Sequence, residues 1–148
     1  MRAPFQILAI PYKQDNGILY GLFHRSDMGQ WQFIAGGGED DETPKEAAIR
    51  EIHEEASVKV TDVIELVSMA YVPANVISAK HRQYWSKDTY VLPEYHFAFE
   101  CNDEIEISKE HSECIWVSYE EAMKKLTWDS NRTALYELNC RLFEKGWR

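Results

Sequence analysis

The stretch from Gly36 to Val58, GGGEDDETPKEAAIREIHEEASV, constrains the fold of this chain more than any other. Thr43 is a suitable N-cap, Pro44 suits the first helical position, and Glu46 completes a capping box with Thr43. A helix is therefore predicted from Pro44 to about Ser57. At about 100° per residue, its apolar side chains fall on one arc and three glutamates on the adjacent arc. We expect the apolar arc to be buried and the carboxylates to border it.

The three glutamates on this arc are Glu51, Glu54 and Glu55. Carboxylates at the edge of a packed face are partly desolvated, so each close pair repels by on the order of 2 to 3 kcal/mol. A hard divalent cation such as Mg²⁺ would reverse that repulsion, and it commonly bridges carboxylates to substrate phosphates. The alternative is a solvated acidic face favoured by the helix dipole. That alternative accounts for Glu39 to Glu42, near the helix start, but poorly for the three glutamates further along.

Length and composition exclude several other classes of protein. The chain has 148 residues, 45% of them hydrophobic, which suits one domain that buries a sizeable core. It lacks a run of about 20 apolar residues and a signal-peptide pattern, which predicts a soluble, cytoplasmic protein without membrane contact. Three widely spaced cysteines match neither a disulfide framework nor a paired metal motif. A net charge of −9 argues against a nucleic-acid partner. The sequence leaves open a monomer or a homodimer.

The remaining segments predict a single mixed α/β domain over residues 1–148. Phe5 to Arg25 indicates two antiparallel strands, because Asn16-Gly17 is a strong hairpin signal. Further strands are predicted within residues 31–35, 63–77, 89–101 and 113–118, with a basic, polar loop at 78–88. Two more helices are predicted, one at 119–126 and one from about Asp129 to about Lys145, which Gly146 would end.

The stretch from Gly36 to Val58 resembles the Nudix signature, Gly-x5-Glu-x7-Arg-Glu-apolar-x-Glu-Glu-x-Gly-apolar, at eight of its nine specified positions. The matching residues are Gly36, Glu42, Arg50, Glu51, Ile52, Glu54, Glu55 and Val58. Ser57 replaces the last glycine, where helices commonly end in a left-handed residue, so it should cost about 1 kcal/mol or shift the exit of the chain. The resemblance implies a Nudix-type α/β/α sandwich with a mixed β-sheet.

The resemblance also implies a reaction. Nudix enzymes use water and Mg²⁺ or Mn²⁺ to hydrolyse a diphosphate linked to another group, and the metal lowers the pKa of a bound water. By this likeness Arg50 orients the carboxylates and Glu42 holds the loop to the helix. The implied metal ligands are the carboxylates of Glu51, Glu54 and Glu55, joined by a main-chain carbonyl near Ala35 and Gly36. Glu54 is also implied to be a catalytic residue.

Many family members recruit one further carboxylate from a downstream loop as a base or an additional metal ligand. Glu110 is the first choice here because it lies just before a predicted strand, where loops reach the site. Glu94 and Glu100 are the alternatives. A solvated surface position accounts for Glu110 about equally well.

Segments outside the signature bear on the substrate. HRSDMGQWQFIAGG, EHSECIWVSYEEAMKKLTW and DSNRTAL resemble the bacterial dihydroneopterin triphosphate pyrophosphatase branch, which releases pyrophosphate from a pterin precursor of folate. The helix predicted to begin at Asp129 or Ser130 would offer backbone donors to a phosphate or ring edge, although N-capping by either residue is the plainer explanation. The candidate substrate-binding residues are His24, Arg25, Gly36, Gly37, Lys80, His81, Arg82, Ser130, Asn131 and Arg132. Aromatic candidates for stacking, which equally suit a core, are Trp31, Tyr71, Tyr84, Trp85 and Trp128.

Other functions remain open at this stage. Hydrolysis of ADP-ribose or a nucleotide sugar is the main rival, since Pro73 lies about where ADP-ribose hydrolases carry a downstream proline. Removal of oxidised nucleoside triphosphates is a third possibility. A non-catalytic nucleotide-binding Nudix module is the alternative of a different class, but such modules usually lose one or more of the carboxylates that are all present here.

Overall fold

Strand β1 (Arg2–Gln14) runs through the middle of the sheet and supplies side chains to both of its faces. Residues 7–11 are all buried, so this strand is a continuous apolar run and not an alternating one. Leu8 and Ile10 pack in the core beneath the C-terminal helices, whereas Ile7 packs with residues of the first helix. The apolar run therefore indicates a strand whose two faces are both covered.

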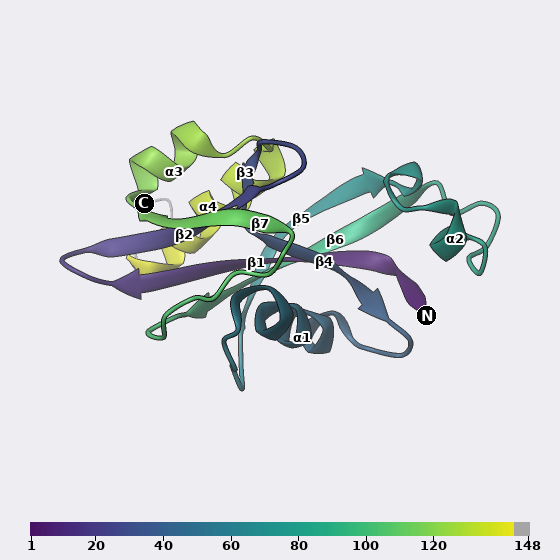
Figure 1. The fold of residues 1–148 in the computed structure, drawn as a ribbon, viewed down its shortest axis with the longest axis horizontal. Coiled ribbons are helices and arrows are strands. Elements are labelled where there is room, and N and C mark those ends of the chain that lie inside the picture. Colours follow the sequence, from purple (N-terminus) through teal and green to yellow (C-terminus); the bar gives the residue numbers. More distant parts are fainter. Residues whose placement is uncertain (144–148) are drawn as a thin grey trace.

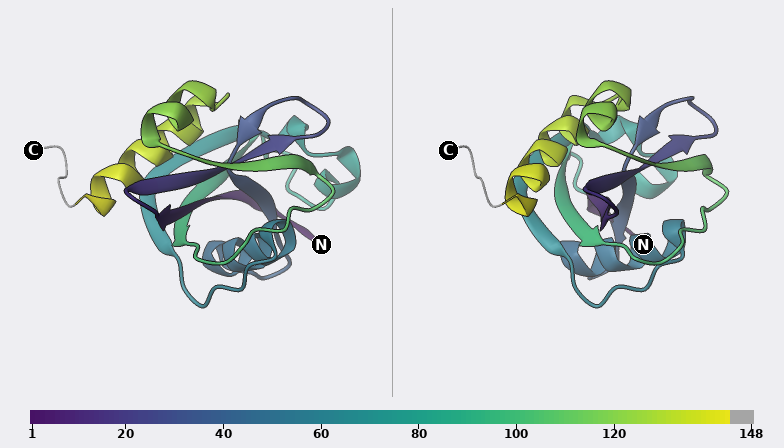
Figure 2. Two further views of the ribbon diagram at one scale, coloured as in Figure 1. Left: turned by 60° about the vertical axis from the view of Figure 1, so that its left-hand side comes forward. Right: turned by 90° about the vertical axis from the view of Figure 1, so that its left-hand side faces the viewer.

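Three layers follow in the computed structural model, which describes residues 1–143 (Figure 1). Helix α1 (Pro44–Ala56) lies against one face of the sheet, and α3 (Tyr119–Lys125) and α4 (Asp129–Leu142) cover the other, as Figure 2 shows from two further sides. This is the α/β/α sandwich with a mixed β-sheet that the resemblance implies. Among the helices between residues 1 and 143, none has the length and apolar character needed to span a bilayer.

The sheet is mixed and branches at β1 and at β2. Its strand order is β3-β2-β1-β6-β5, with β4 pairing on β1 and β7 on β2. The β1–β6 pair is parallel and the other pairs are antiparallel. The remaining strands are β2 (Ile18–Arg25), β3 (Trp31–Gln32), β4 (Ile34–Glu39), β5 (Ile64–Pro73), β6 (Val91–Glu100) and β7 (His111–Val117).

The predicted hairpin is confirmed, but the third predicted strand is wrong in extent. Asn16 and Gly17 both have positive φ, and Tyr12 pairs with Tyr20 across the hairpin. The segment predicted as one strand at 31–35 is divided between β3 and β4, and β4 continues through three glycines to Glu39. Glycine disfavours strands in isolation. Pairing with β1, as between Ile7 and Gly36, overrides that preference.

Two connections also differ from the sequence-based expectation. The polar loop predicted at 78–88 contains a short helix, α2 (Ala79–Arg82), which follows the 3-10 helix η1 (Ala74–Val76). Helix α4 has Trp128 as its N-cap residue and no side-chain cap, so the predicted capping by Asp129 or Ser130 is wrong. Asp129 instead pairs with Arg132. The predicted end of this helix near Lys145 and Gly146 lies outside the described residues.

Helix α1 begins and ends as predicted. The Thr43 hydroxyl accepts from the Glu46 backbone amide, and the Glu46 carboxylate accepts from the Thr43 amide. At the other end Ser57 adopts the left-handed conformation, with φ 59° and ψ 31°. The Ser57 Oγ donates to the Glu106 carbonyl at 3.2 Å, which offsets part of the strain. The signature position therefore keeps its backbone geometry even though its side chain is not glycine.

Replacing Ser57 with Gly is expected to stabilise the protein by about 0.5 kcal/mol, because glycine adopts positive φ without steric cost. The lost hydrogen bond to Glu106 keeps the gain below the full conformational difference. Thermal unfolding would show a melting temperature higher by about 1–2 °C. Ser57→Ala is the matched control, since it loses the same hydrogen bond and keeps the strain, and it should unfold at a lower temperature than wild type. A glycine variant no more stable than the alanine variant would refute the assignment of strain.

Candidate active site

Strand β4 and helix α1 meet at Gly36. A Cβ atom built on Gly36 would lie 2.2 Å from the Glu51 Cδ atom and 2.4 Å from its Oε1 atom, far inside contact distance. The Glu51 carboxylate therefore rests directly on the glycine backbone. This close approach explains why β4 has glycine at this position, and it places one carboxylate against the main chain of the strand.

Arg50 connects the loop, the strand and the helix. Its Nε and Nη2 atoms donate to the two carboxylate oxygens of Glu42 at 2.7 and 3.0 Å, and Nη2 also donates to the Gly37 carbonyl at 2.7 Å. Its Nη1 atom donates to Glu51 at 3.0 Å and to Glu54 at 3.1 Å. The guanidinium holds the pKa of Glu42 below its usual range. One planar cation thus sets the positions of three carboxylates.

Burial of the glutamates is deeper than their place on the helix suggests. Glu51 and Glu55 are buried, with relative exposures of 9% and 5%, and only Glu54 is exposed. Burial raises the pKa of Glu51 to about 7, against the opposing charge of Arg50. Burial, followed by the neighbouring Glu110 carboxyl, raises the pKa of Glu55 to about 9. The acidic arc is therefore part of the buried face and not merely its border.

The donor set suits a hard divalent cation. Glu55 Oε2 is buried and has no hydrogen-bond partner among residues 1–143, although a carboxylate oxygen without a partner is costly in the interior. Within the same residues, no group of three or more His, Cys, Asp or Glu side chains is arranged to hold a metal ion alone. Mg²⁺ commonly retains several waters and takes other oxygens from substrate phosphates. The residues present therefore fit a cation that shares its coordination with water and substrate.

The structure distinguishes the three downstream carboxylate candidates. Glu110 lies directly before β7, and its carboxyl is close enough to Glu55 to raise the pKa of that residue. Glu94 is buried on β6, where His96 Nε2 lies 2.8 Å from its Oε1 atom. Glu100 is exposed at the end of β6. Among residues 1–143, Glu110 is the one of these three candidates that lies beside a carboxylate of α1.

Two predicted substrate-binding residues lie on β2. Arg25 is held by Asp27 through two hydrogen bonds of 2.8 and 3.0 Å, and this contact, followed by smaller effects of Glu110 and Glu55, raises its pKa. His24 Nδ1 lies 2.8 Å from the Ser112 hydroxyl. Arg25 is thus within electrostatic reach of the carboxylates, whereas Ser112, which His24 contacts, lies on β7.

The Ser130–Arg132 element serves packing within the fold. Asn131 is 4% exposed, and its Oδ1 atom accepts from the Phe33 backbone amide at 3.1 Å. Arg132 donates to the Leu126 carbonyl and to Asp129. Within residues 1–143 no hydrogen bond or ion pair joins these residues to the α1 carboxylates. These bonds fasten α4 to the sheet and to the preceding loop, so they account for the SNR sequence without a ligand.

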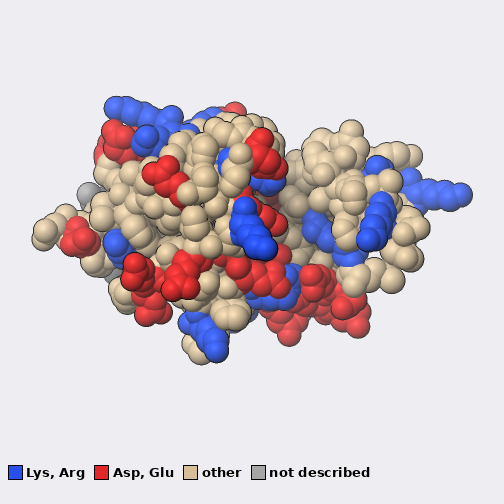
Figure 3. Space-filling view, in the orientation of Figure 1, with Lys and Arg blue, Asp and Glu red and all other residues tan. Residues whose placement is uncertain are grey.

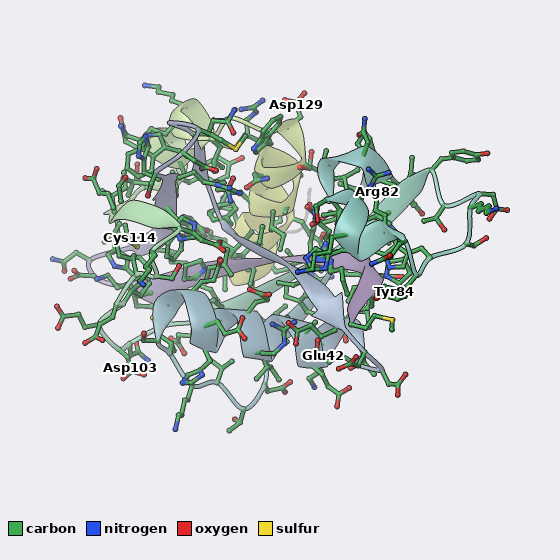
Figure 4. The ribbon with its side chains drawn as sticks, turned by 45° about the vertical axis from the view of Figure 1, so that its right-hand side comes forward. Glu42, Arg82, Tyr84, Asp103, Cys114 and Asp129 are labelled. Atoms are coloured by element: carbon green, nitrogen blue, oxygen red, sulfur yellow. The ribbon has the colours of Figure 1, made fainter. Side chains whose placement is uncertain are left out.

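The basic residues of α2 fall into two groups according to their contacts. Arg82 donates to the Ile77 carbonyl at 2.7 Å and so braces its own turn. Lys80 and His81 instead line a hollow of about 210 Å³ together with Arg2 and Tyr84. Figure 4 shows Arg82 and Tyr84 on the α2 segment, with Glu42 at the near end of α1. Sequence reasoning missed Arg2, because a lone basic residue at the start of a strand carries no motif.

Charge is separated on this side of the molecule. In Figure 3, Asp and Glu side chains gather over the start of α1, and Lys and Arg side chains gather around α2. A larger hollow of about 480 Å³ lies elsewhere, between the start of α1 and the strands β5 and β6. It is lined by Thr43, Pro44, Lys45, Glu65, Leu66, Val67, Met69, Tyr95, His96 and Phe97, none of them a carboxylate of the α1 cluster. This larger hollow is therefore separate from the α1 carboxylates.

The raised pKa values predict how pH and metal affect stability. An unfolded glutamate has a pKa of about 4.3, whereas burial in the fold raises the pKa of Glu51 to about 7 and the pKa of Glu55 to about 9. The folded state thus holds protons that the unfolded state has released, so stability is lost as pH rises through these values. With chelator present, the melting temperature should decrease as the pH rises from 5 to 9, and excess Mg²⁺ should reduce this decrease.

The test is thermal unfolding of wild type and of Glu55→Gln at both ends of this pH range. The glutamine variant keeps the size of the side chain but does not ionise, so its melting temperature should depend less on pH and on Mg²⁺. Equal pH dependence in the two proteins would contradict the assignment of Glu55 as a titrating group in this range.

Known proteins are similar to this chain over most of its length. The family model described as "NUDIX domain" matches residues 6–138. The crystal structure of a protein of Listeria monocytogenes str. 4b F2365 assigned to the NUDIX hydrolases is similar at a TM-score of 0.85 and 43% identity, with 97% of each chain covered. A dihydroneopterin triphosphate diphosphatase of Haemophilus influenzae is 28% identical over 91% of this chain and 88% of its own. An RNA pyrophosphohydrolase of Francisella tularensis is 29% identical over 72% of each. The chain therefore belongs to the NUDIX family and is a Nudix hydrolase.

Proposed function

We propose that this Nudix hydrolase cleaves the diphosphate of a small phosphorylated substrate by attack of water on phosphorus, in the presence of Mg²⁺ or Mn²⁺. The observation that carries the proposal is the convergence of Glu51 and Glu54 on Arg50, with buried Glu55 beside Glu110. Phosphoryl transfer depends mainly on positioning and charge stabilisation. A rigid carboxylate cluster at a glycine-lined strand supplies both.

Each residue has a proposed role. Glu51, Glu54 and Glu55 would hold the divalent cation, which when bound neutralises phosphate charge and makes water more acidic. Arg50 fixes the direction of two of these carboxylates. Glu110, exposed and beside Glu55, is positioned to act as an additional ligand or to accept the proton of the attacking water. The bond from phosphorus to the leaving phosphate oxygen then breaks, and pyrophosphate departs with the electron pair.

Dihydroneopterin triphosphate is the proposed substrate, with the monophosphate and pyrophosphate as products. Similarity to the Haemophilus influenzae diphosphatase over 91% of this chain supports it. The second candidate is the triphosphate end of an RNA, since the Francisella tularensis relative is an RNA pyrophosphohydrolase. The net charge of −9 favours the small molecule, because nucleic-acid binding normally requires a basic surface.

The experiment is release of pyrophosphate and orthophosphate, measured with Mg²⁺, with Mn²⁺ and with chelator. The substrates are dihydroneopterin triphosphate, 5′-triphosphorylated RNA, ADP-ribose, 8-oxo-dGTP and the common nucleoside triphosphates. We expect metal-dependent pyrophosphate release with the highest kcat/KM for the pterin. Higher kcat/KM for another compound would reject the pterin and retain the chemistry. No metal-dependent turnover of any of them would refute the hydrolase proposal and favour a binding module.

A further inference from the structure

Arg2, at the start of β1, is a partly buried cation that has no counter-ion among residues 1–143. None of the ion pairs found among residues 1–143 includes it, although four carboxylates lie within 4.0 Å of Arg50 nearby. Its Nη2 atom donates to Gln6 at 2.9 Å, whereas its Nε atom is buried and has no acceptor in the same described part of the chain. An unpaired buried charge is costly, so a chain retains one only where something offsets that cost.

The Arg2 side chain lies directly on Gly37. A Cβ atom at Gly37 would fall 1.1 Å from Arg2 Nη1 and 1.8 Å from its Cζ atom, so only glycine leaves room for this guanidinium. Burial lowers the pKa of Arg2, and the Glu51 carboxylate is the strongest influence in the opposite direction. Gly37 also presents its carbonyl to Arg50. Arg2 is therefore placed beside the carboxylate cluster but is not neutralised by it.

The position of Arg2 is braced from a second direction. Trp85 Nε1 donates to the Arg2 carbonyl at 2.8 Å, which joins the segment after α2 to the start of β1. Lys80 and His81 of α2 line the same hollow as Arg2, and its volume is about 210 Å³. Among residues 1–143, its lining includes Arg2 and Lys80 and no carboxylate side chain, so it suits an anionic phosphate group. A positively charged hollow thus borders the acidic site of a chain with net charge −9.

We propose that Arg2, together with Lys80 and His81, forms a subsite for those phosphate groups of the substrate that water does not attack. The Arg2 guanidinium and the Lys80 ammonium, which both line the hollow, supply charged donors that match the oxygens of a phosphate. This inference rests on the proposed hydrolysis of a polyphosphate and assigns Arg2 a role that the Nudix signature does not include. It predicts selectivity for a chain of three phosphates over a single phosphate.

The test measures binding without turnover. Isothermal titration of inorganic tripolyphosphate and of orthophosphate, both with excess Mg²⁺, is compared for wild type, Arg2→Met and Arg2→Lys. Methionine keeps an unbranched stem and removes the charge, so tripolyphosphate affinity should fall by about 10- to 100-fold. Lysine should recover part of that loss. The melting temperature of Arg2→Met should equal or exceed that of wild type, because an unpaired buried charge is removed.

Lys124→Gln is the control, since it removes one positive charge from an exposed position on α3. It should bind tripolyphosphate as wild type does. Wild-type affinity of Arg2→Met, or failure of wild type to bind tripolyphosphate, would overturn the subsite. A fall in affinity matched by a large fall in melting temperature, with no recovery in Arg2→Lys, would also overturn it in favour of a structural role.

The outcome separates this inference from the proposed function. Arg2-dependent binding of tripolyphosphate by a protein that hydrolyses none of the tested substrates would support the subsite and reject the hydrolase. Metal-dependent hydrolysis with unchanged KM in Arg2→Met would support the hydrolase and reject the subsite. If both hold, Arg2→Met should raise KM for a triphosphate substrate by about tenfold or more, with a smaller effect on kcat.

Discussion

Glu54→Gln is expected to lower kcat by at least about 100-fold and to leave the fold unchanged. The substitution removes a charge that the proposed mechanism needs, and loss of a few kcal/mol of transition-state stabilisation corresponds to a reduction of this size. The Glu54 side chain is 53% exposed, and within the described part of the chain it pairs with Arg50 alone, so the melting temperature should change by about 1–2 °C at most. Steady-state kinetics with the preferred substrate and thermal unfolding check both parts.

Glu120→Gln provides the matched control for this variant. Glu120 is an exposed glutamate in the first turn of α3, and the same change of charge and shape there should leave kcat unaltered. Full activity of Glu54→Gln would exclude Glu54 as a metal ligand and as a base. A loss of activity that more Mg²⁺ restores would identify a binding role for the charge.

Arg50→Ala is expected to destabilise the protein by about 3–5 kcal/mol and to abolish activity. It leaves Glu42 and Glu51 without their cation, and their side chains are only 21% and 11% exposed. Removing one partner of such a buried pair leaves an uncompensated charge. For a chain of this size the melting temperature should fall by roughly 10 °C. Arg50→Lys should lie between this variant and wild type, because lysine keeps the charge but lacks the planar fork.

Arg141→Gln is the control for the removal of an arginine from an ion pair. Arg141 pairs with Glu137 at 2.8 Å on α4, but its side chain is 43% exposed, so its loss should cost less than about 1 kcal/mol. Adding Glu42→Gln to Arg50→Ala should recover part of the lost stability, since it removes the stranded carboxylate. Equal stability of Arg50→Ala and Arg141→Gln would show that Arg50 does not hold the carboxylates together.

Local sequence was sufficient to predict α1 and the first hairpin. A capping box, a proline at the first turn and a left-handed exit are decided within a few residues, and so is the Asn16-Gly17 turn. The same reasoning was wrong where a partner far along the chain decides the outcome. Strand β4 exists through three glycines because it pairs with β1, and α4 begins after Trp128 without a side-chain cap.

For the site, spacing along α1 was enough to identify which carboxylates share one face of a helix. It did not indicate that Glu51 and Glu55 are themselves buried, because burial depends on the strand that covers the helix. Two of the contacts at the site are between residues far apart in the chain: Glu110 lies beside Glu55, and Arg2 lies on Gly37. Helical period and caps are local properties that a sequence carries directly, whereas desolvation and the meeting of distant charges arise only when strands and helices pack.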